Sequence, residues 1–335
     1  MSDDVLLKPK EARALIHGAL VGAGTAPRNA GYFTEAILDT ELSGLSGHGF
    51  HWLQFYCEHV RSGKVDGKAK PSIKRASAVA FQVNAKGGFA HPAIEVGFAK
   101  LVPAAKKYGI AAMGVYNSYN AATLGFHTGV LAKRGLLAFG FTNSSPAMAP
   151  VGGKSKVLGT NPMSFAVPGK AGKIAFLVDQ SSSAVAWSAV RHAASKGQSI
   201  PLGWALDAAG NPTTDAEKAM EGGSMAPSGG YKGFAQGLIV EVMCAALAGG
   251  NRGMQMGSFT LNDKPIGCGQ FFVAIDPGHF SGAGFARQVT ALIASVASQE
   301  GARMPNSRRE ANAKRLAKEG LPIDADLLAR LQGFI

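Results

Sequence analysis

Apolar residues recur at helical spacing near both ends of the chain. In the first such segment Leu15, Ile16 and Ala19 fall on one side of a helix, and the same period returns further along. A proline and a group of arginines interrupt it in the C-terminal part. The pattern predicts helices at residues 10–22, 28–43, 52–61 and 281–335, with a break at residues 303–309.

The middle of the chain alternates short apolar runs, typical of strands, with helical periods. Strands are predicted at residues 77–83, 110–116, 136–142, 163–167, 174–178 and 271–275, and helices at residues 93–108, 122–134, 183–195 and 232–248. Pro92 suits the first turn of the first of these helices, and Pro103 is expected to kink it. The fold class is therefore α/β, with a helical lobe from residues 1–75 and 280–335 and a central sheet lobe at residues 76–279.

The composition indicates a large buried core. The 335 residues are 46% hydrophobic and 17% charged, which is enough apolar material for two lobes. The 44 glycines are scattered, several in pairs, and indicate tight turns. The formal net charge is +12, but the basic residues lack the dense stripe with aromatics that binds nucleic acid. We expect no nucleic-acid partner, while anion binding and a solvated basic face remain two interpretations of the charge.

The chain contains three cysteines, Cys57, Cys244 and Cys268. Their odd number and wide spacing fit neither a disulfide framework nor a zinc site, so no metal is expected. Buried thiols in a reducing compartment, the cytoplasm, are the simplest interpretation. Residues 1–4 lack the apolar run of a signal peptide. The longest apolar stretch, residues 237–248, contains Glu241 and is too short to cross a bilayer, so no membrane association is expected.

Residues 44–51 contain too many glycines for a helix interior and are expected to form a loop that carries histidines. In this loop His48 stands between Gly47 and Gly49, so a ligand can approach its ring closely. An imidazole titrates near neutral pH, which suits it to give a proton to a carbonyl or an imine. The alternative is an exposed histidine in a flexible turn.

Five further segments combine turn residues with groups that bind anions or substrates. Residues 117–122 lie between a strand and a helix, where free N–H groups favour phosphate, although helix capping also explains them. Residues 303–309 hold arginines suited to the 2′-phosphate of NADP, or to a solvated helix end. The other three are residues 159–162 with Thr160, residues 179–183 at a strand end and residues 227–233 before a helix. No G-x-G-x-x-G follows a predicted strand, so a Rossmann fingerprint is absent.

Taken together and in their order along the chain, the segments resemble the malate/L-lactate dehydrogenase family, also called the sulfolactate dehydrogenase-like family. The resemblance extends over nearly the whole chain through SGLSGHG, GGFAHPA, NSYNAATLG, LGTNPMSFA, VDQSSSAVA, PSGGYKGFAQGLIVE and RMPNSRR. Within the family the chain looks most similar to the Δ1-piperideine-2-carboxylate/Δ1-pyrroline-2-carboxylate reductases. The resemblance implies a sulfolactate dehydrogenase-like fold with a non-Rossmann NAD(P)-binding sheet lobe, a homodimer, and NADPH or alternatively NADH as cofactor.

The resemblance also implies roles for individual residues. The proton-donor histidine falls on His48, and the substrate-contacting threonine falls on Thr160, with Trp52 and His51 as further substrate contacts. Cofactor contacts fall on Asn120, Ala121, Ala122, Thr123, Leu124, Asp179, Gln180, Ser181, Gly230, Tyr231, Arg303, Met304, Pro305, Asn306, Ser307, Arg308 and Arg309.

Three positions depart from the family pattern. Gly47 stands where a serine usually precedes the histidine, and Trp52 stands where an arginine usually binds the substrate carboxylate. A charge-relay aspartate expected about ten residues after Asp179 is replaced by Ala189. An aromatic residue at position 52 favours a ring or a bulkier apolar substrate over malate.

The predicted activity is the NAD(P)H-dependent reduction of cyclic ketimines, from Δ1-pyrroline-2-carboxylate to L-proline and from Δ1-piperideine-2-carboxylate to L-pipecolate. Its partner is thus a small 2-imino or 2-oxo acid. One alternative is an NAD(P)-dependent dehydrogenase of open-chain 2-hydroxy acids such as malate, lactate, ureidoglycolate or a sugar acid. Another is a catalytically weak NADPH-binding protein of the same fold, because the altered relay positions remove usual helpers of the histidine.

Overall fold

A seven-stranded mixed sheet forms the centre of the molecule in the computed structural model, which describes residues 4–335. Its strand order is β2-β3-β4-β11-β5-β6-β7, and β3 and β4 are parallel while every other neighbouring pair is antiparallel. The strands are β2 (Ser72–Arg75), β3 (Ala80–Asn84), β4 (Ile110–Ser118), β5 (Leu137–Thr142), β6 (Met163–Pro168), β7 (Ile174–Gln180) and β11 (Cys268–Ile275).

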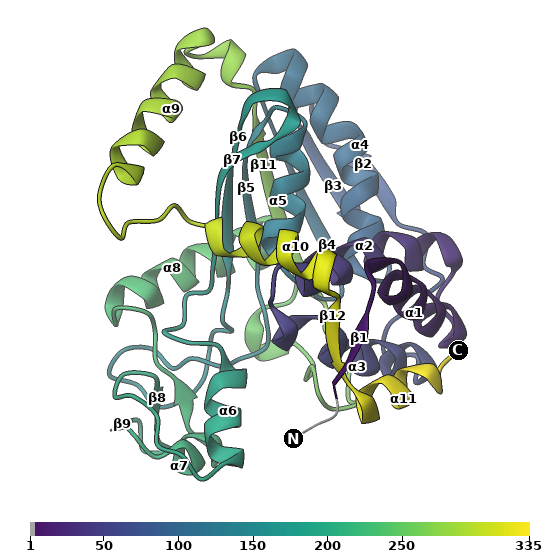
Figure 1. Cartoon of the computed structure of the whole chain (residues 1–335), viewed down its shortest axis with the longest axis vertical. Helices are drawn as coiled ribbons and strands as arrows, with labels where there is room; N and C mark the ends of the chain where they lie inside the picture. Colours follow the sequence, from purple (N-terminus) through teal and green to yellow (C-terminus); the bar gives the residue numbers. More distant parts are fainter. Residues whose placement is uncertain (1–3) are drawn as a thin grey trace.

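Helices cover both faces of this sheet (Figure 1). On one face α4 (Ala90–Tyr108) and α5 (Leu124–Lys133) bury an apolar cluster that includes Met113 of β4. On the other face α8 (Tyr231–Glu241) continues as the π-helical turn η3 (Val242–Leu247). The next residue along β4, Gly114, faces η3, and a Cβ there would come within 3.0 Å of Ala248. Neighbouring residues of a strand point to opposite faces, so the two contacts place the two helix layers on opposite sides.

The two ends of the chain meet in one helical lobe. It contains α1 (Pro9–Gly22), α2 (Pro27–Leu42), α3 (Phe50–Arg61), α10 (Ser307–Glu319) and α11 (Ala325–Gln332), with the two-stranded sheet of β1 (Asp4–Leu7) and β12 (Leu321–Asp324). One apolar cluster joins Ile16 and Leu20 near the N-terminus to Leu321 and Leu331 near the C-terminus. Burial of this shared cluster therefore holds the two termini together.

A small sheet unit projects from the central sheet (Figure 1). It consists of β8 (Ala205–Leu206), β9 (Pro212–Thr213) and β10 (Ser224–Met225), flanked by α6 (Trp187–Ser195) and α7 (Ala216–Met220). Val190 of α6 is fully buried in a cluster of its own with Ala205 and Ala219. This cluster fixes α6, which lies on the side of the unit nearest the helical lobe in Figure 1.

Helix α9 (Ala283–Ala297) stands apart from the other helices (Figure 1). None of its residues is buried, although its sequence includes Phe285, Leu292 and Ile293. The remaining short helical turns are η1 (Ser46–His48), η2 (Lys170–Gly172), η4 (Gly253–Gln255) and η5 (Pro277–His279).

The predicted α/β class and the main helices and strands are confirmed, with several corrections. The tail at residues 281–335 is not purely helical, because β12 pairs with β1. The helical break predicted at residues 303–309 lies earlier, at residues 298–306, because α9 ends at Ala297 and α10 begins at Ser307. The helix predicted from residue 183 begins only at Trp187, and α4 continues through Pro103. Pattern alone missed β2, α7 and the two-residue strands of the small sheet unit.

The division into lobes at residues 75 and 280 stays a prediction, and α9 contributes nothing to the apolar cluster of the helical lobe. Residues 1–3 of the acidic N-terminal segment, from which the absence of a signal peptide was predicted, lie outside the described residues. Within residues 4–335, no helix combines the length and apolar character needed to cross a membrane.

Candidate active site

His48 lies at the end of the short turn η1, directly after α2. The turn is fixed from below by Glu41, a buried residue in the last turn of α2, whose carboxylate accepts a hydrogen bond from the backbone N–H of Phe50. A Cβ at Gly49 would overlap that carboxyl group, so only glycine fits between His48 and α3. From the other side, Asn312 of α10 donates to the carbonyl of Ser43 at 3.1 Å.

The surroundings of His48 keep its ring accessible and lower its proton affinity. Solvent reaches the side chain in the isolated chain. Protein atoms nevertheless crowd around the ring, and the resulting desolvation lowers its pKa below the usual value of 6.5. The charge of Asp179 acts in the opposite direction and raises the pKa, while the charge of Arg309 lowers it. A ligand can therefore reach a ring whose pKa is lowered mainly by desolvation and modified by the charges of Asp179 and Arg309.

Those two charges form an ion pair that joins the sheet to the helical lobe. Asp179 lies near the end of β7, and Arg309 lies in the first turn of α10. The Arg309 Nη1 atom lies 2.9 Å from the Asp179 Oδ2 atom, and both side chains are largely shielded from solvent. Ala189, where the sequence suggested a lost relay aspartate, lies in α6. Asp179 is the carboxylate whose charge raises the pKa of His48.

The turn at residues 120–124 connects β4 to α5, as predicted, and it is held by three contacts. The backbone N–H of Ala122 donates to Asn120 Oδ1 at 3.2 Å, and Ala122 adopts φ 51°. His127 Nε2 lies 3.0 Å from the carbonyl oxygen of Ala121. The hydroxyls of Thr123 and Thr40 lie 2.8 Å apart. A left-handed alanine is an uncommon conformation that persists only when its surroundings enforce it.

The same turn leads directly to Asp179. A Cβ at Gly125 would come within 2.9 Å of Asp179 Oδ2, so the first turn of α5 approaches the Asp179–Arg309 pair as closely as glycine permits. No side chain caps the N-terminus of α5, which begins at Leu124. The Phe126 N–H donates to the Thr123 carbonyl at 3.2 Å, and those of Leu124 and Gly125 are left for an anion. The structure thus brings His48, Asp179, Arg309 and the 120–124 turn together.

Thr160 is connected to the segment at residues 179–183. Its hydroxyl lies 3.4 Å from the hydroxyl of Ser144, and its carbonyl accepts a hydrogen bond from the Ser182 N–H at 2.8 Å. The Ser182 carbonyl in turn accepts from the Ser228 N–H at 2.9 Å. These bonds tie Thr160 to the loop that precedes α8.

Gly230 and Tyr231 lie where that loop enters α8. Gly230 adopts φ 64° and no side chain caps the helix. Tyr231 is 73% exposed, so its ring is free to contact a ligand. Gln180 reaches α8 through Gln236 at 3.4 Å, and the hydroxyl of Ser181 lies 3.0 Å from that of Ser183.

The tail segment at residues 303–309 divides into two kinds of arginine. Arg309 is bound to Asp179, whereas Arg303 and Arg308 are exposed and make no hydrogen bond or ion pair within residues 4–335. The turn between them contains Met304, Pro305, Asn306 and Ser307, with Asn306 at φ 74° and the Ser307 hydroxyl donating to the Met304 carbonyl at 2.9 Å.

His51 was predicted to lie in a loop, but it lies in a helix together with Trp52. Both belong to the first turn of α3, because the helix begins at Phe50. Trp52 is half-buried and packs against the apolar cluster of the helical lobe and against Phe55, with ring centroids 5.3 Å apart. The pKa of His51 is lowered by desolvation and then by the charges of Arg191 and Arg330. Their substrate roles stay predictions.

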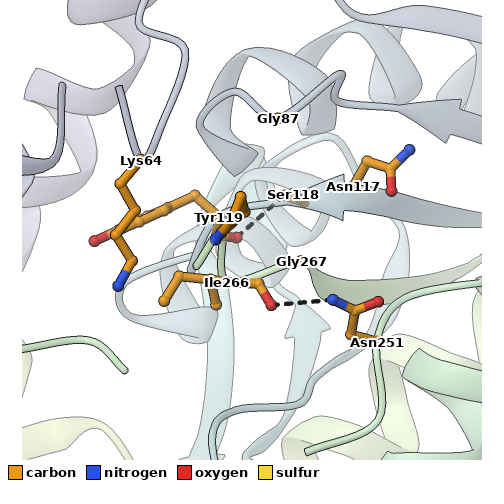
Figure 2. Close-up of a pocket in the computed structure, with 9 residues that line it drawn as sticks. Lys64, Gly87, Asn117, Ser118, Tyr119, Asn251, Ile266 and Gly267 are labelled. Carbon is orange, nitrogen blue, oxygen red and sulfur yellow. Dashed lines mark hydrogen bonds between the residues drawn. The ribbon is translucent and has the colours of Figure 1, made fainter. Parts of the chain in front are cut away.

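A separate pocket lies at the end of β4, beside Ser118 and Tyr119 (Figure 2). Its lining includes Lys64 and Asn251 together with Asn117, Ser118 and Tyr119, the first part of the predicted 117–122 segment, but none of the residues to which the resemblance assigns a role. The Lys64 ammonium already donates to two backbone carbonyls and to Asp263, and Ser118 donates to the carbonyl of Tyr119. The pocket therefore offers few free polar groups to a ligand and is not the candidate active site.

Sequence patterns pointed to none of the supporting groups Thr40, Glu41, Gly125 and His127. Each contacts a partner remote in the chain or beneath a loop, so no local spacing identifies it. All three cysteines are buried and unpaired. Within the described range, no three His, Cys, Asp or Glu side chains are grouped as metal ligands would be.

The sequence model of the malate/L-lactate dehydrogenase family matches residues 7–332. The chain belongs to this family. Among curated proteins it is 37% identical to a (2R)-3-sulfolactate dehydrogenase (NADP(+)) of Chromohalobacter salexigens, covering 98% of both chains. It is 34% identical to a Δ1-pyrroline-2-carboxylate reductase of Ancylobacter novellus, covering 100% of this chain and 98% of the relative.

The fold agrees with solved structures of the family. The crystal structure of Δ1-piperideine-2-carboxylate reductase from Pseudomonas syringae pv. tomato matches with a TM-score of 0.92 and 30% identity, over 99% of this chain and 100% of that one. The predicted resemblance and the sulfolactate dehydrogenase-like fold are thereby confirmed. As a member of this family, the chain is an oxidoreductase.

Proposed function

We propose that this chain reduces the cyclic ketimines Δ1-pyrroline-2-carboxylate and Δ1-piperideine-2-carboxylate with NADPH, and that His48 supplies the proton. The observation that carries the proposal is the position of His48: an accessible imidazole within reach of the charges of Asp179 and Arg309. Reductases of these ketimines are among its relatives, at 34% identity in one case. The half-buried Trp52 beside the site favours a ring substrate.

The residues present fit a phosphorylated dinucleotide. The N-termini of α5 and α8 both lack a side-chain cap, and Arg303 and Arg308 are uncommitted. Free N–H groups and arginines are the groups that bind phosphate, so NADPH would be held by residues 120–124, by Gly230 and Tyr231 and by the tail arginines, with NADH as a weaker substitute. Bound reduced nicotinamide supplies a hydride.

The residues of the protein position His48 and favour its protonated form. Glu41 and Gly49 fix the backbone on either side of the histidine. The Asp179 carboxylate favours the imidazolium, and the Arg309 pair holds that carboxylate in place. Protonated His48 can then give its proton to the ring nitrogen of a ketimine, or to the oxygen of a 2-oxo acid, as that atom gains charge.

A dehydrogenase of open-chain 2-hydroxy acids is the second candidate, because the Chromohalobacter relative, at 37% identity, acts on sulfolactate. Its mechanism would use His48 in the same way. The two candidates differ only in the substrate that fits beside Trp52.

One experiment tests the proposal and separates the candidates. NADPH and NADH oxidation are followed with the two ketimines, pyruvate, oxaloacetate and sulfopyruvate. We expect the highest kcat/KM with a ketimine and NADPH. His48→Ala should lower kcat roughly 100-fold or more and leave NADPH affinity within about twofold. Fastest turnover with an open-chain acid would favour the second candidate, and equal loss of turnover and NADPH binding would remove His48 from the chemistry.

A homodimer in a reducing compartment such as the cytoplasm completes the proposal. Its support is the unburied but apolar α9, together with half-buried phenylalanines on the nearby strands: Phe139, Phe165 and Phe176. A second copy would cover both. The three buried, unpaired thiols support the compartment.

A further inference from the structure

Helix α6 presents two uncommitted polar side chains on one face. Ser188 and Arg191 are three residues apart, so they lie one above the other on the helix. Both are exposed, and neither makes a hydrogen bond or an ion pair anywhere in residues 4–335. On the opposite face Val190 and Ala193 are buried in the small sheet unit, which fixes the direction of the helix.

Ser188 stands beside the loop that carries the proton donor. A Cβ at Gly47 would lie 3.6 Å from the Ser188 hydroxyl oxygen, and apart from the neighbouring residues in sequence no other atom comes within 4 Å. The small sheet unit thus places a free hydroxyl next to the residue that precedes His48. This contact joins segments about 140 residues apart in the chain, as their numbering shows.

The charge of Arg191 acts on a residue at the start of α3. It is one of two charges that lower the pKa of His51, and the other belongs to Arg330. Ser188 lies beside Gly47, and Arg191 follows one helical turn later on the same face, so the free face of α6 is turned toward the η1 turn. The influence of Arg191 on His51 agrees with this placement.

We propose that Ser188 and Arg191 bind the carboxylate of the substrate. A hydroxyl and a guanidinium on one helix face are the donors that a carboxylate accepts, and arginine binds it through two parallel hydrogen bonds. Ser188 stands beside Gly47, and neither Ser188 nor Arg191 has a partner within residues 4–335, so both donors are free for a ligand next to His48. The inference rests on the proposed function in that the substrate is a small acid.

Binding of unreactive acids tests the inference without relying on turnover. The probes are pyrrole-2-carboxylate, a planar ring acid, and oxamate, an open-chain one, each titrated by calorimetry into the full chain saturated with NADP+. Arg191→Gln should weaken binding of the better probe roughly 10- to 100-fold, and Ser188→Ala roughly 3- to 10-fold. NADPH affinity should stay within about twofold in both variants.

Lys196→Gln is the matched control, because it removes one positive charge from an exposed residue at the end of the same helix. It should leave probe affinity unchanged. Equal losses in the Lys196 and Arg191 variants would reduce the effect to general charge and overturn the inference. So would unchanged affinity in the Arg191 variant, or a wild type that binds neither probe.

Moving the hydroxyl from position 188 to position 47 supplies a second test. Gly47 has no left-handed φ, and a Cβ there would meet only the Ser188 hydroxyl at the ordinary contact distance of 3.6 Å, so a serine fits there. Gly47→Ser added to Ser188→Ala should restore most of the lost probe affinity, whereas a merely structural role of Ser188 predicts no rescue. Turnover with normal probe affinity in Arg191→Gln would overturn this inference alone. Arg191-dependent probe binding in a protein that reduces no acid would overturn the proposed function alone.

Discussion

At the scale of single residues, the chemistry depends on the protonation of His48, whose pKa desolvation lowers most and two nearby charges modify. Asp179 raises the pKa of the imidazole and Arg309 lowers it. The two side chains neutralise each other through their ion pair, so removing either one exposes the full effect of the other. The direction in which the pH profile moves therefore reports which charge acts on the ring.

Asp179→Asn should shift the alkaline limb of the kcat profile to lower pH. Without the carboxylate, His48 loses its proton at lower pH, and reduction requires the protonated ring. We expect kcat at pH 7 to fall roughly 10-fold or more, measured at saturating NADPH and acid substrate.

Arg309→Gln should move the same limb to higher pH, because the guanidinium lowers the pKa of His48. Asp326→Asn, an exposed carboxylate in α11, serves as the control and should move nothing. If both site variants shift the limb in the same direction, Asp179 and Arg309 do not have opposite effects on the pKa of His48.

Glu41 makes the free energy of unfolding depend on pH, and this dependence can be measured separately from activity. Burial raises its pKa from 4.5 to about 7. The folded protein therefore favours protonated Glu41. The contribution of this protonated carboxyl to the free energy of unfolding is complete below the pKa of the unfolded chain and is lost as the pH rises through about 7. A shift of this size corresponds to roughly 3 kcal/mol between pH 4.5 and pH 8.

Glu41→Gln should lose less unfolding free energy over that pH interval than the wild type does, as measured by urea denaturation. The glutamine oxygen can still accept from the Phe50 N–H, so the loop contact is retained. Glu58→Gln, on the exposed side of α3, is the matched control. A pH dependence identical in wild type and Glu41→Gln would show that this carboxyl does not titrate with folding.

At the scale of elements, the C-terminal turn of α2 positions both functional loops. Glu41 holds the His48 loop, and its neighbour Thr40 holds the 120–124 turn through Thr123. The Thr40 hydroxyl also donates to the Ala36 carbonyl at 2.7 Å, so it accepts the hydrogen bond that Thr123 donates. One helix end thus sets the separation between the proton donor and the predicted cofactor turn.

Thr40→Val should raise the KM for NADPH roughly 3- to 10-fold and leave kcat at saturation nearly unchanged. The substitution leaves the buried Thr123 hydroxyl without its acceptor, which costs about 1–3 kcal/mol and loosens the turn. Thr34→Val is the matched control, because Thr34 is buried in the same helix but bonds only the Ala30 carbonyl. A similar rise of KM in the control would make the effect one of helix stability.

At the scale of the whole molecule, α9 and the phenylalanines of β5, β6 and β7 are apolar surface that the single chain leaves exposed or half-exposed. Leu292 of α9 is 54% exposed. Apolar area of this kind is characteristic of an interface between subunits.

Leu292→Asp should convert a dimer into a monomer at micromolar concentration, measured by analytical ultracentrifugation, because a charge would be buried at the interface. Leu202→Asp places the same charge at a 70% exposed leucine in the loop after α6 and should leave the mass unchanged. A wild-type chain that sediments as a monomer would contradict the proposed homodimer.

Local pattern was sufficient for many of the elements. The helical period placed α1 and α2 to within one residue, and apolar runs located β4, β5 and β6. It was insufficient where an element is short or depends on a distant partner. The strand β12 has only four residues and exists because β1 pairs with it across the length of the chain.

The candidate site shows the same division. The sequence identified His48, Asp179 and Arg309 as separate candidates, because glycine-flanked, strand-end and clustered basic residues have recognisable local contexts. That Asp179 pairs with Arg309 and acts on His48 appeared only in the folded chain. Ser188 and Arg191 had no local signal, since their significance comes from the loop they face.

The sequence by itself determined the family, the α/β class and the glycine-bordered histidine, because periodicity and turn chemistry act between residues close along the chain. Tertiary structure alone decided which charges surround that histidine, which hydroxyl stands beside Gly47 and which apolar helix remains uncovered. These depend on contacts between residues more than a hundred positions apart, and such contacts are fixed by how whole lobes pack and not by the order of neighbouring residues.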